Sequence, residues 1–320
     1  MRYLGRILVV WVFVLLPVVA VGQEPTAAEG AAQLRVMSFN MWNGGDEGGQ
    51  PLEQTKAVIL ASKADIVGVQ ESRGVAEEGP RPDNAARLAE MLGWHHFDQG
   101  DNSTSILSRF PIIDATPRGW GVAVELENGK RMYVFNAHLP ASPYQPYQLL
   151  DIPYGDAPFL KGEEALIEAA IAARGAQVDR LLSELRVALM SDTPVFLTGD
   201  FNEPSHLDWT EAATEADVTP LRVTYPTSKK IVEAGMHDAW RSVYPDEVAQ
   251  PGWTWTPLTA EDDPEDRHDR IDFVYVAGPV AILHCEIVGE RTERADIVVQ
   301  PYPSDHRAVV VTVALQADTR

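Results

Sequence analysis

Five segments of this 320-residue chain read as apolar β-strands, and each of them carries a polar side chain at one of its ends. Strand ends held by a rigid scaffold are the usual place for catalytic and binding groups. The polar groups at these ends are Asn40, Gln70–Glu71, His138, Asp200 with Asn202, and Asp305–His306. We therefore expect the whole chain to build one site that binds a hard metal ion and handles phosphate.

The segments between these strand ends predict an α+β fold in a single catalytic domain over residues 34–316, because polar ends occur near both termini. Helices are expected at 52–61, at 84–92 with Gly93 ending it, and in a segment that runs to about residue 190. Asn128–Gly129 predicts a hairpin turn. The predicted strands are 34–41, 65–70, 105–107, 121–126, 131–137, 194–199, 271–276 and 308–315.

Six short motifs that contain these groups occur in a fixed order along the chain. They are Ser38-Phe39-Asn40, Val69-Gln70-Glu71, Asn136-Ala137-His138-Leu139, Gly199-Asp200-Phe201-Asn202, Arg270-Ile271-Asp272-Phe273 and Ser304-Asp305-His306. In these motifs the chain resembles the endonuclease/exonuclease/phosphatase superfamily, which includes deoxyribonuclease I-like nucleases, neutral sphingomyelinases and inositol-polyphosphate phosphatases. The resemblance spans roughly residues 34–315 and implies a four-layer αββα sandwich, in which two packed mixed sheets are flanked by helices.

Hydrolysis of a phosphate ester at neutral pH needs charge stabilisation on the phosphoryl oxygens, and Mg²⁺ suits that task with carboxylate ligands. Glu71 is the first choice as ligand, with Asn40 beside it, and the resemblance adds Asp305. Mn²⁺ or Ca²⁺ are alternative ions. Outside this context Glu71 would equally fit a surface acid and Asn40 a turn residue. Trp42 stands where many nucleases of the family have an acid, which puts a second metal ligand there in doubt.

Two histidines and two aspartates carry the predicted acid–base chemistry. The resemblance implies that Asp200 orients or deprotonates the attacking water and that Asn202 holds the phosphate, whereas a bare Asp-x-Asn could also be a local turn. His138 and His306 suit donation of protons or hydrogen bonds to the phosphoryl group and the leaving oxygen. Asp272 is expected to orient His306 and keep it protonated, or alternatively to pair with the neighbouring Arg270.

The charge of the chain disfavours long nucleic acid as a partner. Its formal net charge is −21, and removal of residues 1–22, which hold two arginines and no acid, would give −23. Proteins that bind duplexes normally present a basic face, and the sequence contains no cluster of lysines or arginines. The acidic run 261–266 precedes the Arg270-Ile271-Asp272 motif and is either a solvated loop or negative charge near the site mouth.

The first 22 residues read as a signal peptide, since Arg2 and Arg6 precede an apolar stretch and a small-x-small cleavage pattern before Gln23. An uncleaved anchor is the alternative. Residues 23–33 read as a flexible lead-in. With a signal peptide the protein would be secreted or periplasmic, with no stable membrane span after cleavage. Cys285 is the sole cysteine, which excludes an intramolecular disulfide, and its apolar surroundings indicate a buried, inert thiol.

Residues 141–161 begin three residues after His138 and combine prolines with aromatic residues. The aromatic rings are candidates for substrate contact or for packing of the loop itself: Tyr144, Tyr147, Tyr154 and Phe159. We expect a monomeric, exported Mg²⁺-dependent phosphodiesterase or phosphatase that hydrolyses a small-molecule, sugar or lipid-headgroup ester by in-line attack of water. An exported nuclease with the same mechanism is the alternative, and a non-catalytic binding module on the same scaffold is a further one.

Overall fold

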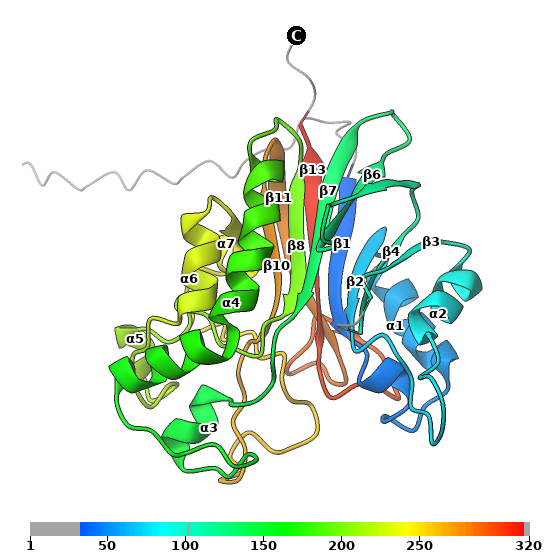
Figure 1. Cartoon of the computed structure of the whole chain (residues 1–320). Coiled ribbons are helices and arrows are strands. Elements are labelled where there is room, and N and C mark those ends of the chain that lie inside the picture. The colour runs from blue at the N-terminus through cyan, green and yellow to red at the C-terminus, as the bar shows by residue number, and fades with distance from the viewer. Residues whose placement is uncertain (1–32, 101–102, 317–320) are drawn as a thin grey trace, which may run out of the picture.

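Two mixed β-sheets lie face to face at the centre of the computed structural model, which describes residues 33–100 and 103–316 (Figure 1). The first sheet has seven strands in the order β12-β11-β13-β1-β2-β4-β3, and the second has six in the order β5-β6-β7-β8-β10-β9. The bounds of the first are β1 Gln33–Asn40, β2 Ile66–Gln70, β3 His95–Asp98, β4 Thr104–Ser108, β11 Val280–Gly289, β12 Ile297–Val298 and β13 Ala308–Leu315. Those of the second are β5 Ile112–Ala115, β6 Gly121–Glu125, β7 Arg131–His138, β8 Val195–Asp200, β9 His237–Asp238 and β10 Asp272–Ala277.

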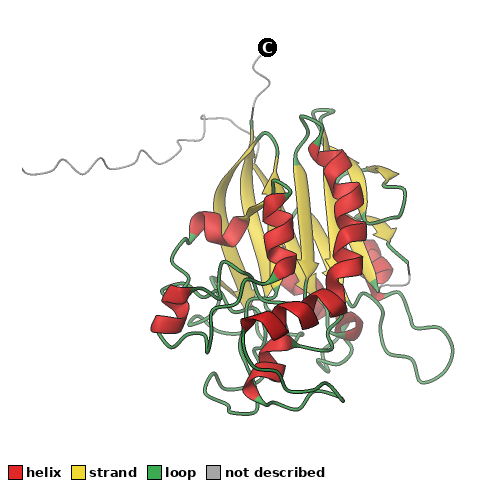
Figure 2. Cartoon of the chain, turned by 60° about the vertical axis from the view of Figure 1, so that its left-hand side comes forward, coloured by secondary structure: helices red, strands yellow, loops and turns green. Residues whose placement is uncertain are grey.

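Helices cover the outer face of each sheet (Figures 1 and 2). Helices α1 and α2 lie on the first sheet, and the long helix α4 and helix α6 lie on the second. The helices are α1 Leu52–Ser62, α2 Asn84–Leu92, α3 Gln145–Leu150, α4 Glu163–Leu189, α5 Glu211–Glu215, α6 Pro226–Glu233 and α7 Ala239–Val243, with a short 3₁₀ turn at Asn43–Gly45.

Three apolar clusters separate these layers and account for their order. One fills the space between the sheets and includes Val36, Val134, Phe196 and Val311. A second packs the apolar face of α4 against β7, β8 and β10, and a third packs α1 and α2 against β1, β2 and β4. Each sheet is therefore apolar on both faces, which requires helices on the outside. The predicted four-layer αββα sandwich is confirmed.

Local signals in the sequence explain where several elements begin and end. Helix α2 starts after Asp83, whose carboxylate accepts a hydrogen bond from the Ala86 N–H, and it ends at Gly93 in the left-handed conformation with φ of 71°. Gly129, with φ of 76°, makes the turn between β6 and β7 as predicted. Asp238 caps α7 by accepting a hydrogen bond from the Arg241 N–H.

The predicted strands and helices are all present, with shifts of one or two residues at their ends, but the prediction omitted shorter elements. It missed β3, β5, β9, β11, β12, α3, α5, α6 and α7. Most of these span too few residues to show a period, and α3 lies within the proline-containing segment 141–161, which was interpreted as a loop. Strand β11 had been recognised only as an apolar run around Cys285. That cysteine is buried, and burial raises the pKa of its thiol, as expected for an inert residue.

The predicted signal peptide, residues 1–22, lies outside the described residues, as does the predicted lead-in up to residue 32; Gln33 begins β1. Within residues 33–100 and 103–316, no helix has the length and apolar character needed to cross a bilayer.

Candidate active site

Three adjacent strands of the second sheet bring His138, Asp200 and Asp272 side by side. Asp200 at the end of β8 pairs in register with His138 on the parallel strand β7 and with Asp272 on the antiparallel strand β10. Residues in register on neighbouring strands point to the same face of the sheet. The Nε2 atom of His138 lies 3.6 Å from Oδ2 of Asp200. Asp200 is therefore the centre of the group.

The first sheet completes the site from the opposite side. The Asn40 side-chain amide, at the end of β1, donates to Oδ2 of Asp200 at 2.9 Å and to Oε1 of Glu71 at 3.2 Å. The backbone N–H of Asn43 donates to the other oxygen of Glu71 at 2.8 Å. The loops after β1, β2, β7 and β8 gather at the lower edge of the sheets in Figure 1, on the side of α3. All eight predicted catalytic and metal-binding residues lie at this edge.

His306 reaches the same centre from the loop before β13. Its Nδ1 atom lies 2.9 Å from Oδ2 of Asp272, and its Nε2 atom lies 3.8 Å from Oδ2 of Asp200. Burial by itself lowers the pKa of His306, but the carboxylates of Asp272 and Asp200 raise it well above its ordinary value. Burial also raises the pKa of Asp272, so the pair holds at least one proton at neutral pH.

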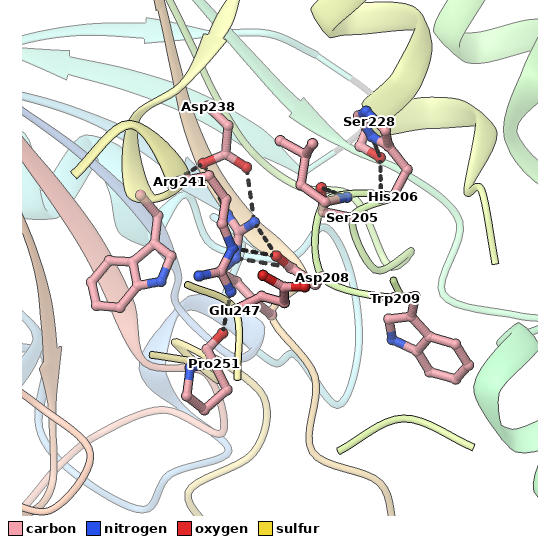
Figure 3. Close-up of polar contacts among 12 residues, drawn as sticks. Ser205, His206, Asp208, Trp209, Ser228, Asp238, Arg241, Glu247 and Pro251 are labelled. Atoms are coloured by element: carbon pink, nitrogen blue, oxygen red, sulfur yellow. Dashed lines mark hydrogen bonds and ion pairs between the residues drawn. The ribbon is translucent and has the colours of Figure 1, made fainter. Parts of the chain in front are cut away.

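The alternative ion pair between Asp272 and Arg270 is not formed. Arg270 instead binds Asp208 at 2.8 Å and Asp238 at 2.8 Å. Arg241 also binds Asp208, and Figure 3 shows Arg241 between the carboxylates of Asp208 and Asp238, with Pro251 on its other side. This buried network anchors Arg270, two positions before Asp272, and leaves the Asp272 carboxylate free to bind His306.

The donors around Glu71 fit a hard divalent ion. Asp305 Oδ1 is buried and has no hydrogen-bond partner. Burial raises the pKa of Asp305 to about 6, and the carboxylates of Glu71 and Asp200 add to the rise. Buried carboxylates that lie close together without a cation among them repel one another, and oxygen ligands of this kind suit Mg²⁺ and related ions. The residues present therefore fit a divalent metal held by Glu71 and Asp305 next to Asn40.

A second group, Asp200, Asp272 and His306, has ligand atoms that all lie within 4.8 Å of one another and could also hold a metal ion. The hydrogen bond between His306 and Asp272 occupies the imidazole Nδ1, and a protonated imidazole cannot ligate a metal. This hydrogen bond favours the predicted position of the metal beside Glu71, which stays a prediction, with the proton held by the second group.

Asn202 forms the local turn that its motif allowed, while its role in holding the phosphate stays a prediction. Its backbone N–H donates to Oδ1 of Asp200 at 2.9 Å, which is the local turn, and its side-chain amide donates to the Leu139 carbonyl at 3.0 Å. Its φ of 48° places it in the left-handed region. The turn directs Oδ1 of Asp200 inward and leaves Oδ2 to face the site.

The four aromatic residues of segment 141–161 divide into two pairs. Tyr144 and Tyr147 are buried and bind Asp269 and Asp266 through their hydroxyls, so they pack the loop onto the body. Tyr154 and Phe159 are 41% and 51% exposed. Burial raises the pKa of Tyr154, and the carboxylates of Glu71 and Asp200 add to the rise. The Tyr154 ring packs on Tyr147, which in turn contacts Trp255 next to His306, so Tyr154 belongs to the aromatic group beside the site.

Trp255 is a site neighbour that sequence analysis did not identify. Its backbone pairs with His306, and its ring centroid lies 6.2 Å from that of His306 at an interplanar angle of 30°. Tyr147 packs on Trp255 at 5.8 Å and on Tyr154 at 5.8 Å. The only signal was the Trp-rich run at 253–255, which had no assigned role.

Gln70, which was expected among the polar groups of the site, and Asn136 instead join the two sheets behind it. The Gln70 amide donates to Asn136 Oδ1 at 2.6 Å, and the Asn136 amide donates to the Val69 carbonyl at 2.9 Å. Gly68 permits this close approach, because a Cβ there would lie 1.9 Å from Thr198 Oγ1. The polar residue that precedes Glu71 is thus structural.

The acidic run 261–266 is partly neutralised within the fold. Glu261 binds Arg291 and Arg294, and Asp266 accepts from the Tyr147 hydroxyl. Tyr147 belongs to the aromatic group beside His306, so part of this run lies near the site rather than in a remote solvated loop. His268, close to the start of β10 in the sequence, contacts Thr259 through its Nε2 at 3.0 Å.

Comparison with known proteins decides the family. The sequence profile described as the Endonuclease/Exonuclease/phosphatase family matches residues 37–306, a range that contains every predicted catalytic and metal-binding residue. The protein belongs to this family. It is accordingly a metal-dependent hydrolase of phosphoric esters, and the predicted resemblance is confirmed.

Individual relatives are more distant. The chain is 28% identical over 298 residues to the uncharacterized protein F14F9.5 of Caenorhabditis elegans, with coverage of 86% of this chain and 90% of that protein. Among solved structures, an endonuclease/exonuclease/phosphatase from Beutenbergia cavernae is 19% identical with a TM-score of 0.55, over 89% of this chain and 72% of the other. An AP endonuclease from Archaeoglobus fulgidus is 16% identical with a TM-score of 0.54, over 89% and 100%. At sequence identities this low, the structural likeness shows only that the chains share a fold.

Proposed function

We propose that the protein is an exported, Mg²⁺-dependent phosphoesterase that hydrolyses a phosphodiester or phosphomonoester of a small molecule, sugar or lipid headgroup by in-line attack of water. The observation that carries this proposal is the position of Asp200 Oδ2. This oxygen lies 2.9 Å from the Asn40 amide, 3.6 Å from the imidazole of His138 and 3.8 Å from that of His306. A water activated by Asp200 can attack the phosphorus directly, so the reaction needs no covalent nucleophile.

Each residue of the group has a task in this reaction. Asp200 accepts the proton of the attacking water through Oδ2, because its Oδ1 is already held by the Asn202 N–H. His306, which carries a proton through its pairing with Asp272, donates a hydrogen bond to a phosphoryl oxygen. His138 lies on the other side of Asp200 and can donate to the leaving oxygen. Bound Mg²⁺ would offset the negative charge that builds up on the phosphoryl oxygens.

The preference for a small substrate is supported by charge and by the loop next to the site. The chain has a net charge of −21, and acidic residues of the run 261–266 lie beside the aromatic group that contacts His306. Long polyanions would be repelled from such a surface, whereas a small ester that presents an apolar or ring-shaped group could pack against Tyr154 and Trp255.

A set of esters with one common leaving group tests the proposal. Methyl 4-nitrophenyl phosphate, 4-nitrophenyl phosphorylcholine, thymidine 5′-(4-nitrophenyl) phosphate and the monoester 4-nitrophenyl phosphate are each assayed with Mg²⁺, with Mn²⁺, with Ca²⁺ and with chelator. Turnover of at least one ester that chelator abolishes and Mg²⁺ restores is expected. Absence of metal-dependent turnover on all of them, together with nicking of plasmid DNA, would favour the nuclease alternative.

That alternative has a specific basis, since two of the similar solved structures are described as an AP endonuclease and as a 3′ phosphatase from Neisseria bound to a product DNA hairpin. The non-catalytic alternative has none, because the polar residues of all six motifs meet at one edge.

Export is supported by the pattern of residues 1–22. Mass spectrometry of protein recovered from the periplasm or medium should give a chain that starts at Gln23. A chain that retains Met1 in the membrane fraction would show an anchor instead. Gel filtration of the released protein should give a monomer.

A further inference from the structure

A buried arginine on α4 links the aromatic segment 141–161 to the catalytic turn. Arg174 has no solvent exposure. Its guanidinium donates to Gln145 Oε1 at 2.6 Å and to the Pro143 carbonyl at 3.0 Å, both in the segment. The same guanidinium lies 3.9 Å from Oε2 of Glu203, which follows Asn202 directly in the chain.

The hydrogen bonds continue from Arg174 through the segment. Gln145 donates to Gln148 Oε1 at 3.2 Å, and Gln148 donates in turn to the Pro158 carbonyl at 2.8 Å. The Leu160 N–H donates to the Gln148 carbonyl at 2.9 Å. The start, the helix α3 and the end of the segment are therefore held by one polar chain, and Tyr154 lies between its anchor points Gln148 and Pro158.

Glu203 faces Arg174 from the catalytic strand. It is 1% exposed, and its Oε1 accepts from the Thr227 N–H at 2.8 Å. Within residues 33–100 and 103–316, neither its Oε2 nor the buried Nε of Arg174 has a hydrogen-bond partner. A buried charge pair of this kind is weak evidence for stability, because the desolvation of both groups offsets their attraction. Its better-attested use is to fix one arrangement of the chain.

We propose that Arg174, with Glu203, is a positioning residue that locks segment 141–161 onto the Asp200–Asn202 turn and so holds Tyr154 at the mouth of the site, where it selects the substrate. The selection rests on the proposed phosphoesterase function. Segment 141–161 follows β7, which carries His138, and Glu203 follows β8, which carries Asp200, so the pair couples the loops of two catalytic strands. Because Arg174 contacts neither the substrate nor the reacting groups, its loss should alter recognition more than chemistry.

The test removes the pair as a unit. A single Arg174→Met change would leave the Glu203 carboxylate buried without its partner and would destabilise the fold, whereas Arg174→Met with Glu203→Gln removes both charges at similar volume. The control is Arg35→Met with Glu286→Gln, which removes another ion pair, with an N–O distance of 2.7 Å, on β1 and β11. Both double variants are assayed on the methyl, choline and thymidine esters of 4-nitrophenyl phosphate, and hydrogen exchange is followed over residues 143–160.

In the Arg174/Glu203 variant, KM for the larger ester that the natural protein prefers should rise at least about tenfold, because displacement of a positioning group by about 1 Å is costly. The methyl ester should keep its kcat/KM, and exchange in residues 143–160 should become faster. The control should change neither. Equal losses on methyl and larger esters, unchanged exchange, or no preference of the natural protein for either larger ester would each overturn the proposal. Failure of the natural protein on every ester would contradict the proposed function instead, and the exchange result would still decide whether Arg174 locks the segment.

Discussion

The Nδ1 atom of His306 shares a proton with Oδ2 of Asp272 in a hydrogen bond of 2.9 Å. The Asp272 residue has no solvent exposure, and His306 is 5% exposed. Water cannot compete for either group, so the hydrogen bond fixes both the orientation of the ring and its proton. Oδ2 of Asp200 lies 3.8 Å from the other ring nitrogen. A fixed proton next to a carboxylate that can accept one is the arrangement that hydrolysis requires.

Asp272→Asn should lower the pKa of His306, because the neutral amide no longer stabilises the imidazolium. The turnover number should fall by at least about 10², the scale for a lost acid–base group. The pKa is measured from the pH dependence of the His306 ring signals in NMR spectra, and kcat is measured on the ester that the natural protein turns over. An unchanged His306 pKa would show that Asp272 does not hold this proton.

Glu71→Gln should abolish metal-dependent activity with little effect on folding, because the amide keeps the shape of the side chain and removes its charge. Titration calorimetry should show a loss of Mg²⁺ affinity, and Glu53→Gln on the exposed side of α1 is the matched control. Mg²⁺ affinity equal to that of the natural protein would instead assign the ion to Asp200, Asp272 and His306.

The strand positions and most site residues could be predicted from the sequence because each polar group stands at one end of an apolar run long enough to identify. Asn40, Glu71 and Asp200 are separated by up to 160 residues. The order of the motifs along the chain, together with the expectation that the strand ends meet at one edge of the sheets, was sufficient to place these residues together. Side-chain partners could not be predicted in the same way. Asp272 stood two residues from Arg270, and only the three-dimensional structure shows that Asp208 and Asp238 take that arginine.

Arg174 and Trp255 were missed for a related reason. Arg174 occupies a helical position whose neighbours in sequence are mostly small or charged, and its partners Gln145 and Glu203 are 29 positions away on either side. Trp255 reaches the site through a backbone pairing with His306 that no local pattern encodes. Aromatic residues of segment 141–161 could be identified as a set, but their division into buried and exposed pairs depends on Asp266 and Asp269.

The pKa of Asp305 gives a prediction for pH. Burial raises it to about 6 from an ordinary 3.8, so the folded, metal-free protein binds this proton more tightly than the unfolded chain does. The contribution to stability is therefore fully present below about pH 4 and is lost as the pH rises through about 6. Metal binding needs the ionised carboxylate, so Mg²⁺ affinity should fall as the pH drops through the same value.

Asp305→Asn separates these two effects. Without metal, the variant should have a higher Tm than the natural protein at pH 7, because no buried charge has to be formed, and the difference should disappear near pH 4. Addition of Mg²⁺ should raise the Tm of the natural protein much more than that of the variant. A variant whose Tm rises with Mg²⁺ as much as that of the natural protein would remove Asp305 from the metal site.

The last prediction concerns the two pairs of aromatic residues in segment 141–161. Tyr154→Ala should raise KM for the larger esters of 4-nitrophenyl phosphate and leave the methyl ester unaffected, because the exposed Tyr154 ring belongs to the aromatic group that reaches His306 through Tyr147 and Trp255. Tyr144→Phe is the matched change at a buried position. It removes the hydrogen bond of 2.8 Å to Asp269 and should lower the free energy of unfolding by about 1–3 kcal/mol, the cost of leaving a buried acceptor without its donor. Selectivity among the esters should not change in Tyr144→Phe. If Tyr154→Ala lowers stability without altering the ratio of KM values, the exposed pair packs the loop as the buried pair does, and the segment has no part in recognition.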